Sequence, residues 1–293
     1  MFPDEFDYER ADSVADALDR LGTHADAGRE VELLAGGHGL VPALKARERT
    51  PDVVVDLAVE ELAGVEERAD HLAIGALTTY ADLADSEPVR GRAPVVAAAA
   101  AETGDVQIRN RGTLGGNLVE AHPASDPPAA VLAADATLVL RGPEGERDVP
   151  ATDFFRGDRE TAVGTREILT EIRLPTAGST ADDAATDSAY VRHTHPATGY
   201  ALVGVAAVLE RVDGVVTDAR VAATGVVDRP LRLPSVEAAL SGDRPADALD
   251  EAVAVADADV DADRLRSDAY ASGEFREHLL ETYVERALTE SVE

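Results

Sequence analysis

Apolar residues in the first third of the chain recur with spacings that alternate between helical and strand-like. Residues 13–21 have the spacing of an amphipathic helix, which Asp12 or Ser13 could cap. Short β-branched and apolar runs follow, separated by polar or glycine-rich turns, as is typical of short strands. We predict strands at 31–35, 53–57 and 71–77, and helices at 40–47, where Pro42 falls in the tolerated first turn, and at 79–84, which Thr78 or Thr79 could cap.

The middle of the chain is richer in alanine. Its composition predicts a helix at 95–103, and the apolar run at 127–140 predicts a helix that leads into a strand. Residues 166–175 predict another strand. Residues 176–188 are small, polar and acidic without any periodicity, which is typical of a linker or an exposed loop.

We place a domain boundary in that segment, between a domain at 1–176 and a domain at 187–293. Residues 201–226 contain two apolar runs joined at Asp213-Gly214, which is a strong hairpin signal. Helices are predicted after them at 233–240, 245–256 and 275–288. The second domain is therefore expected to be a small α+β unit with an antiparallel sheet and helices on one face.

Composition excludes several kinds of chemistry. The 293 residues contain no cysteine, which rules out disulfides, a thiol nucleophile and cysteine-ligated zinc or iron–sulfur centres in this polypeptide. The acidic N-terminus lacks the features of a signal peptide, and no apolar run reaches the length of a membrane span. We therefore expect a soluble, cytoplasmic protein.

The formal net charge of −30 argues against binding nucleic acid through a broad basic surface. The acidic residues are spread along the chain, and Lys45 is the only lysine. This balance resembles proteins of salt-loving organisms, in which high ionic strength screens self-repulsion. We interpret the charge as an adaptation to the solvent.

Two glycine-rich segments carry the candidate chemistry. AGGHG (35–39) follows a predicted strand and precedes a predicted helix, where backbone N–H groups can converge on an anion. TLGGN (113–117) lies in a second cluster, which could be a tight turn or a close backbone approach. Two such turns could hold a pyrophosphate with backbone donors alone, but neither matches the Rossmann or Walker pattern.

A family resemblance adds to this interpretation. LLAGGHGLVPALKAR (33–47) and IRNRGTLGGNLVEAHPASDPPAA (108–130) resemble the FAD-binding medium subunit of the molybdenum hydroxylases, which include xanthine dehydrogenase and aerobic carbon monoxide dehydrogenase. The similarity extends over most of the chain, through FDYERADSVADAL, IGALTTYADL, EILTEIRLP and YVRHTHPATGYALVGVAAV. It implies an α+β fold: an FAD-binding domain of the vanillyl-alcohol-oxidase (PCMH) type, made of two α/β subdomains, and a smaller antiparallel-sheet-plus-helices domain.

The resemblance also implies a set of cofactor-binding residues. The first glycine segment would wrap the FAD pyrophosphate, flanked by leucines, and the second would approach the cofactor from the other side. Asp126 would accept hydrogen bonds from the cofactor's hydroxyls, Leu169 would lie near the flavin ring, and Tyr200 would lie against the isoalloxazine. The expected site residues are thus Leu34, Ala35, Gly36, Gly37, His38, Gly39, Leu40, Thr113, Gly115, Gly116, Asn117, Asp126, Leu169, Arg192 and Tyr200.

The chain departs from the family pattern at three positions. Gly39 stands where the family usually has serine, Arg192 where it often has lysine, and Thr194 where it has arginine. Arg192 is the best local candidate for the basic contact at the flavin's negative edge. Other interpretations stay open: His193 and His195 could suggest a metal, although two histidines alone make a poor site. Arg109 and Arg111 could face a partner or solvent, and Tyr200 could be a core residue.

The implied function is electron transfer. A separate large subunit would hold the molybdenum cofactor, a small subunit would hold the [2Fe-2S] clusters, and the FAD of this chain would pass electrons to an external acceptor. The family commonly forms dimers of such heterotrimers, and no catalytic residue and no metal ligand is expected on this chain. The alternatives are a free-standing FAD-dependent oxidoreductase of the same fold and a flavin-free assembly subunit.

Overall fold

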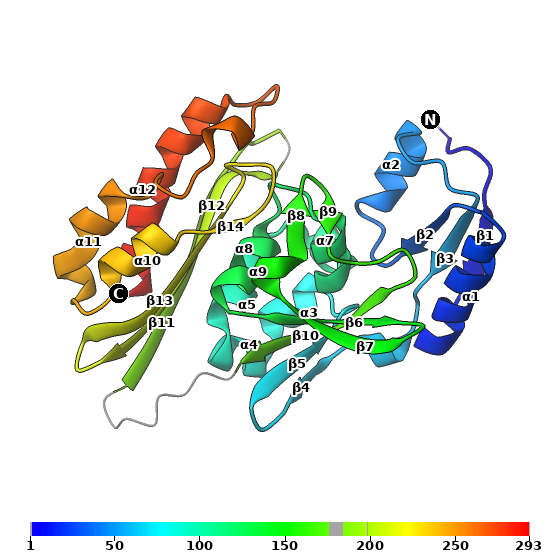
Figure 1. Cartoon of the computed structure of the whole chain (residues 1–293), viewed down its shortest axis with the longest axis horizontal. Helices are drawn as coiled ribbons and strands as arrows, with labels where there is room; N and C mark the ends of the chain where they lie inside the picture. The colour runs from blue at the N-terminus through cyan, green and yellow to red at the C-terminus, as the bar shows by residue number, and fades with distance from the viewer. Residues whose placement is uncertain (1, 176–183, 198, 293) are drawn as a thin grey trace.

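The computed structural model describes residues 2–175, 184–197 and 199–292. Three larger sheets follow one another along the molecule from the N-terminus to the C-terminus, each with its own helices (Figure 1). The first sheet is the smallest and carries the strand that leads into the first glycine segment. The third sheet stands at the opposite end, with the C-terminal helices on its outer side.

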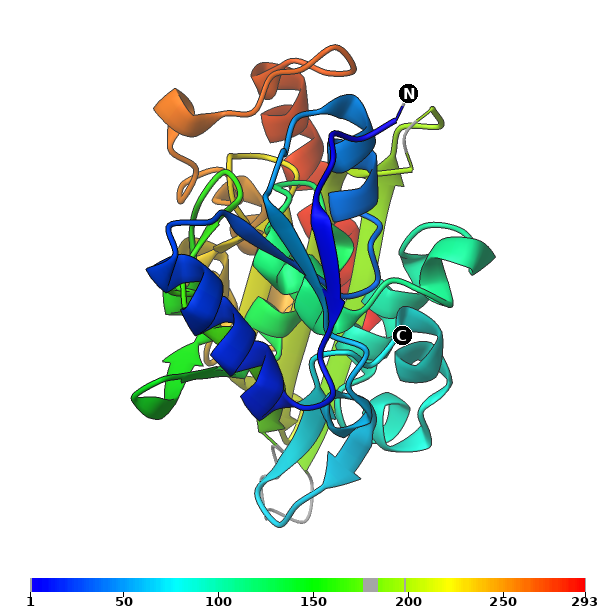
Figure 2. The same ribbon diagram turned by 90° about the vertical axis from the view of Figure 1, so that its right-hand side faces the viewer.

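The N-terminal unit is a parallel sheet with strand order β1-β3-β2. Helix α1 begins after Ser13, whose side chain accepts a hydrogen bond from the Asp16 amide, so the cap is Ser13 rather than Asp12. The apolar face of α1 packs on the buried residues of β3, as the helical spacing predicts (Figure 2). The elements of this unit are β1 (Asp7–Arg10), α1 (Val14–Asp26), β2 (Val31–Leu34), α2 (Leu40–Ala46), β3 (Val53–Asp56) and a 3₁₀ turn (Glu60–Leu62).

The central unit is an antiparallel sheet with strand order β4-β5-β10-β6-β7. A series of helices lies between β5 and β6 in the sequence, and the middle of the alanine-rich helix α5 is largely buried. The elements are β4 (Val65–Glu67), β5 (His71–Gly75), α3 (Tyr80–Asp85), α4 (Glu87–Arg92), α5 (Pro94–Glu102), α6 (Val106–Arg109), α7 (Leu114–Glu120), α8 (Asp126–Ala133), β6 (Thr137–Gly142), β7 (Gly145–Pro150), α9 (Ala151–Phe154), β8 (Phe155–Gly157), β9 (Glu160–Thr161) and β10 (Ile168–Pro175).

The C-terminal unit is an antiparallel sheet with strand order β11-β12-β13-β14 and helices on one face. Ala206, Val208 and Ala222 of this sheet also belong to the apolar core of the central unit, so the two units share buried surface. The elements are β11 (Ala184–Thr194), β12 (Ala201–Val212), β13 (Val215–Thr224), β14 (Leu231–Arg232), α10 (Pro234–Leu240), α11 (Pro245–Ala254), a 3₁₀ turn (Ala262–Arg264) and α12 (Gly273–Ser291).

Two sequence predictions are wrong: the loop at 176–188 and the turn at 113–117. The expected loop at 176–188 already contains the start of β11, because Ala184 pairs with Val212 and the ladder continues in register to His193. Residues 176–183 lie outside the described residues. The segment TLGGN is the start of helix α7 rather than a turn. We propose that the C-terminal domain begins by Ala184.

The remaining predicted elements form close to their expected bounds, and Thr79 rather than Thr78 caps α3. Strands β4 and β7 were not predicted because they are largely exposed and polar. Within the described ranges, no helix has the length and hydrophobicity required to span a bilayer.

Candidate functional site

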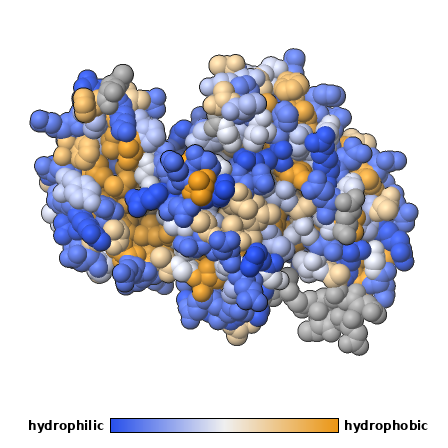
Figure 3. All heavy atoms as spheres, turned by 180° about the vertical axis from the view of Figure 1, so that it is seen from behind, coloured by the Kyte–Doolittle hydropathy of each residue, from blue (hydrophilic) through white to orange (hydrophobic). Residues whose placement is uncertain are grey.

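A pocket of about 890 Å³ lies where the N-terminal and central units face each other. Leu21, Val31 and Leu33 line it from one side, and residues of α7 and the segment after it line it from the other. Tyr200 completes the wall from the C-terminal unit. Seen from behind, apolar side chains gather along the inner side of the lobe at the left, beside a hollow in the surface (Figure 3).

The first glycine segment forms a loop between β2 and α2, as the sequence predicts. Gly37 has a φ of 81°, a left-handed conformation that favours glycine. Within the described part of the chain, the amides of Gly36, Gly37, His38 and Gly39 donate no hydrogen bond. Unpaired backbone N–H groups at a pocket wall need an acceptor, and an anionic ligand would supply one.

The two glycine segments contact each other. A Cβ atom added to Gly36 would lie 2.3 Å from the carbonyl oxygen of Arg111 and 2.8 Å from the Cα of Gly112. Gly116 lies beside Ala35 in the same way, with an added Cβ 3.3 Å from the alanine Cβ. The glycines therefore permit a close approach of two backbones.

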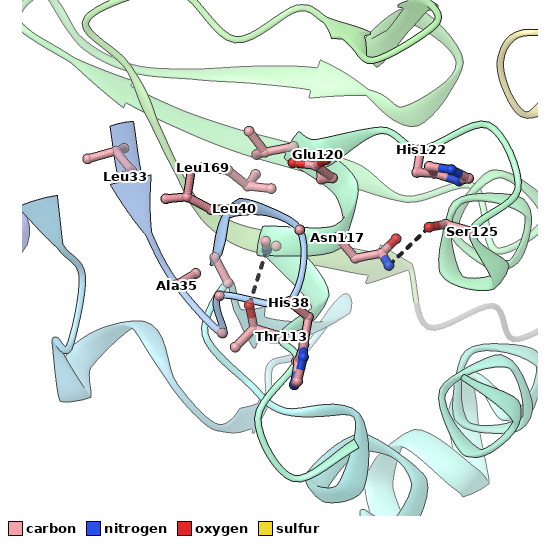
Figure 4. Close-up of a pocket in the computed structure, with 18 of the residues that line it drawn as sticks. Leu33, Ala35, His38, Leu40, Thr113, Asn117, Glu120, His122, Ser125 and Leu169 are labelled. Carbon is pink, nitrogen blue, oxygen red and sulfur yellow. Dashed lines mark hydrogen bonds between the residues drawn. The ribbon is translucent and has the colours of Figure 1, made fainter. Parts of the chain in front are cut away.

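The amides of Leu114, Gly115, Gly116 and Asn117 in the second glycine segment already donate hydrogen bonds within the protein, so fewer backbone donors are offered from this side than from the first segment. Thr113 caps α7 by accepting from the Gly116 amide at 3.2 Å, as Figure 4 shows. The Leu114 amide donates to Thr78 and the Gly115 amide to Ala76. No larger residue fits at position 115, because a Cβ atom added to Gly115 would lie 2.5 Å from the Cβ of Ala76. This segment thus shapes the pocket through its packing.

Asn117 is a polar residue of α7 that lines the pocket. Its side-chain nitrogen donates to the Ser125 hydroxyl at 3.2 Å, and its side-chain oxygen is buried without a partner in the described structure. Both residues line the pocket (Figure 4). A buried oxygen without a donor is costly, so Asn117 is suited to accept a hydrogen bond from a bound molecule.

The apolar part of the wall comes from different elements. Leu33, Leu40 and Leu169 gather at one end of the close-up, with His122 and Ser125 at the other (Figure 4). Leu34 does not line the pocket, because strand alternation turns it to the opposite face, where it packs with Leu44 and Val54.

Asp126 lies at the start of α8 and is only 3% exposed. Tyr190 donates to one carboxylate oxygen at 2.5 Å, and Arg192 donates to the other at 3.0 Å. Burial raises the pKa of Asp126 to about 6, although the charge of Arg192 and both hydrogen bonds lower it. Asp126 lines the pocket, and its carboxylate accepts hydrogen bonds from Tyr190 and Arg192 of β11. Arg192 is directed toward Asp126 and does not line the pocket.

Tyr200 lines the pocket and stacks on His122, with ring centroids 4.2 Å apart and an interplanar angle of 20°. The Nδ1 atom of His122 accepts from the Ala124 amide at 3.2 Å. Burial, together with the charges of Arg159 and Arg266, lowers the pKa of His122 to about 3. The pocket therefore presents a neutral imidazole at neutral pH.

The pKa of His122 predicts a pH dependence of stability. Between its ordinary pKa of 6.5 and about 3, the unfolded chain binds a proton that the folded chain does not. Folding stability should therefore fall as the pH falls through this range. Chemical denaturation at pH 7 and pH 5 measures the free energy of unfolding that each protein loses between these two pH values. We expect this loss to be smaller in His122→Gln than in the wild type, by up to about 2 kcal/mol. His278→Gln, at an exposed position on α12, is the control. An equal loss in wild type and His122→Gln would contradict this prediction.

The residues left open by the sequence have other partners. The Nδ1 atom of His193 lies 3.0 Å from the Tyr283 hydroxyl, and the His195 ring packs against Tyr270. Among the described residues, no group of three or more histidine and acidic side chains is arranged to hold a metal ion. Arg109 donates to the Gly104 carbonyl at 2.8 Å, and Arg111 is exposed.

All the expected site residues except Leu34 and Arg192 line this one pocket. Sequence reasoning missed Arg49, Glu120 and His122, which line it as well. Glu120 lies one helical turn after Asn117, so helical spacing would have placed both on one face of α7. That signal was hidden because the segment was interpreted as a turn.

Two models of known protein families match the chain, one over each domain. Residues 4–177 match the model described as "FAD binding domain in molybdopterin dehydrogenase". Residues 188–291 match the model described as "CO dehydrogenase flavoprotein C-terminal domain".

Individual relatives match over most of the chain. The carbon monoxide dehydrogenase medium chain of Hydrogenophaga pseudoflava is 36% identical over 92% of both chains. The glyceraldehyde dehydrogenase medium chain of Sulfolobus acidocaldarius is 35% identical over 81% of both chains. A solved structure of carbon monoxide dehydrogenase from H. pseudoflava superposes with a TM-score of 0.92 at 34% identity, covering 100% of this chain and 99% of that one.

Proposed function

The chain belongs to the family of FAD-binding medium subunits of molybdenum hydroxylases, and from this premise we propose that it receives electrons from iron–sulfur clusters of a partner subunit and delivers them through FAD to an external acceptor. The members of this family are subunits of multi-subunit oxidoreductases. The observation that carries the proposal is the pocket that brings both glycine segments together.

The pocket fits a dinucleotide flavin in its donors and acceptors. The unpaired amides of Gly36 to Gly39 suit a pyrophosphate, and the unpartnered oxygen of Asn117 suits a hydroxyl or amide donor. Gly36 and Gly116 allow the two glycine segments that line this pocket to approach each other closely. We propose that Leu169 and Tyr200, which line the same pocket, contact the flat rings.

FAD would supply the redox chemistry when bound, because its ring system can take up and release electrons. The chain's own residues would bind the cofactor, orient it and limit the access of water. Tyr200 and His122 form a neutral stacked pair at the wall, which places polarizable surface beside the pocket without adding charge. No acid–base group is required for such electron transfer.

The proposed partners follow from the composition. The chain has no cysteine, so cysteine-ligated clusters must be supplied by another subunit. We propose a large subunit with the molybdenum cofactor and a small iron–sulfur subunit, assembled as a dimer of heterotrimers. The substrate of the complex would be determined by the large subunit.

The test is reconstitution of the purified full chain in high salt with FAD. We expect stoichiometric FAD by absorption and acid release, and no substrate oxidation until the large and small subunits are added. Turnover of a substrate by the isolated chain would favour a free-standing oxidoreductase. Failure to bind FAD both alone and in the co-expressed complex would favour a flavin-free assembly subunit.

A further inference from the structure

The charged residues that line the pocket are mainly acidic. Glu32, Asp105, Glu120, Asp126 and Glu167 contribute carboxyl groups to its wall. Among the described residues that line it, Arg49 is the only arginine or lysine. A phosphate group in this pocket would therefore depend strongly on one guanidinium for charge compensation.

Two carboxylates hold Arg49 in place. One of its terminal nitrogens lies 3.2 Å from a Glu32 oxygen, and the other lies 3.4 Å from Oε2 of Glu120. Burial raises the pKa of Glu32, and the neighbouring Glu120 charge contributes to this shift. The second oxygen of Glu120 pairs with Arg159, which comes from the turn between β8 and β9.

Glu120 also lies directly beside the first glycine loop. A Cβ atom added to Gly39 would lie 2.8 Å from Cδ and 3.0 Å from Oε2 of Glu120. The same oxygen that faces Arg49 thus occupies the space where a side chain at position 39 would lie. The carboxylate of Glu120 thus lies between the loop with unpaired amides on one side and the guanidinium of Arg49 on the other.

We propose that Arg49 is a phosphate-binding residue of this pocket and that the phosphates of the cofactor compete with Glu120 for it. The inference rests on the proposed FAD site and goes beyond it, because it assigns roles to two residues on the basis of their charges. A carboxylate beside a phosphate site repels the ligand unless it is neutralised, and here both of its oxygens face guanidinium groups. A ligand phosphate would take over the charge-assisted hydrogen bonds of Arg49.

The competition predicts effects of opposite sign from two substitutions. Arg49→Gln removes the cation and leaves Glu32 and Glu120 facing the phosphates, so the Kd for FAD should rise by roughly tenfold or more. Glu120→Gln removes the competitor while keeping its size, so the Kd for FAD should fall by about threefold at low salt. The gain should shrink at high salt, because ions screen these half-exposed charges.

The experiment is a titration of the cofactor-free full chain with FAD and, separately, with riboflavin, which lacks the phosphates. Arg49→Gln should weaken FAD and leave riboflavin within twofold of the wild type. Arg47→Gln is the matched control: Arg47 follows α2, pairs with Asp4 at the surface and does not line the pocket. It should leave both affinities unchanged.

Four results would overturn the inference. An equal loss of FAD and riboflavin affinity in Arg49→Gln would assign Arg49 a structural role. An unchanged FAD affinity in that variant, or weaker FAD binding by Glu120→Gln, would remove the competition while leaving the proposed FAD site intact. A wild-type chain that binds neither FAD nor riboflavin, both alone and in the co-expressed complex, would reject the proposed function together with the inference.

Discussion

Replacing Gly36 with alanine will lower the free energy of unfolding by about 3 kcal/mol and deplete the purified protein of FAD. The added methyl group would lie 2.3 Å from the Arg111 carbonyl oxygen and 2.8 Å from the Gly112 Cα, and both of these are backbone atoms. No side-chain rotation can relieve such a contact, so one of the two backbones must move. The loop that moves carries the unpaired amides of the pocket.

Gly22 is the matched control for this substitution. It lies inside α1, its φ is not positive, and an added Cβ would meet nothing within 4 Å. Gly22→Ala should therefore stabilise the protein by about 0.5–1 kcal/mol through helix propensity and should leave the FAD content unchanged. Denaturation curves and acid-released flavin measure the two effects. Wild-type stability and full FAD content in Gly36→Ala would show that the two backbones do not meet as described.

The first glycine loop could be predicted from the sequence because its signals are local. A short apolar strand, two adjacent glycines and a helix with proline in its first turn follow one another within 31–47. The structure has the same order, with Gly37 in the left-handed region. What the sequence does not contain is the partner of Gly36, because Arg111 is 75 positions away in the chain.

The second glycine segment shows why propensity fails at a packed site. The cluster of glycines predicts either a tight turn or a close backbone approach, and the structure has the close approach, within a helix that glycine intrinsically disfavours. In the structure Thr113 caps a helix there, and the glycines are required because Ala76 and Ala35 lie against it. Tertiary packing outweighs the low helix propensity of glycine here. The residues that pack against this helix are distant in the sequence, so the local pattern does not reveal them.

Edge strands account for most of the other differences. The residues of β7 are almost all exposed, so they show no apolar alternation. The first residues of β11 are small and polar, and were included in the loop at 176–188 although they pair with β12. Their strand conformation depends on the neighbouring strand, which no local pattern encodes.

Asp126 is the site residue to which the structure adds most. The family resemblance assigns it to the hydroxyls of the cofactor, and in the structure its two oxygens also accept hydrogen bonds from β11. Arg192 also donates to the Gly199 carbonyl, next to Tyr200. The carboxylate therefore connects α8 to the C-terminal sheet and to the segment that carries Tyr200.

Removing this carboxylate will be more costly than its own contribution to stability suggests. At a pH above its raised pKa of about 6, Asp126 is ionised and buried, so desolvation offsets much of its attraction to Arg192. Asp126→Ala, however, leaves the buried Tyr190 hydroxyl and the Arg192 guanidinium without this acceptor. We expect it to lower the free energy of unfolding by about 3 kcal/mol at pH 8 and to weaken FAD binding through the Tyr200 wall.

Glu102 provides the control on the same guanidinium. It lies 3.3 Å from Arg192 with its side chain 57% exposed, against 4% for Asp126. Because exposed ion pairs contribute little, Glu102→Ala should lower stability by less than about 1 kcal/mol. Tyr190→Phe should be destabilising in the wild type but close to neutral in Asp126→Ala, since its hydroxyl has already lost its acceptor there. Equal losses for the two carboxylates, or additive losses for Asp126 and Tyr190, would show that burial of this network does not determine its energetics.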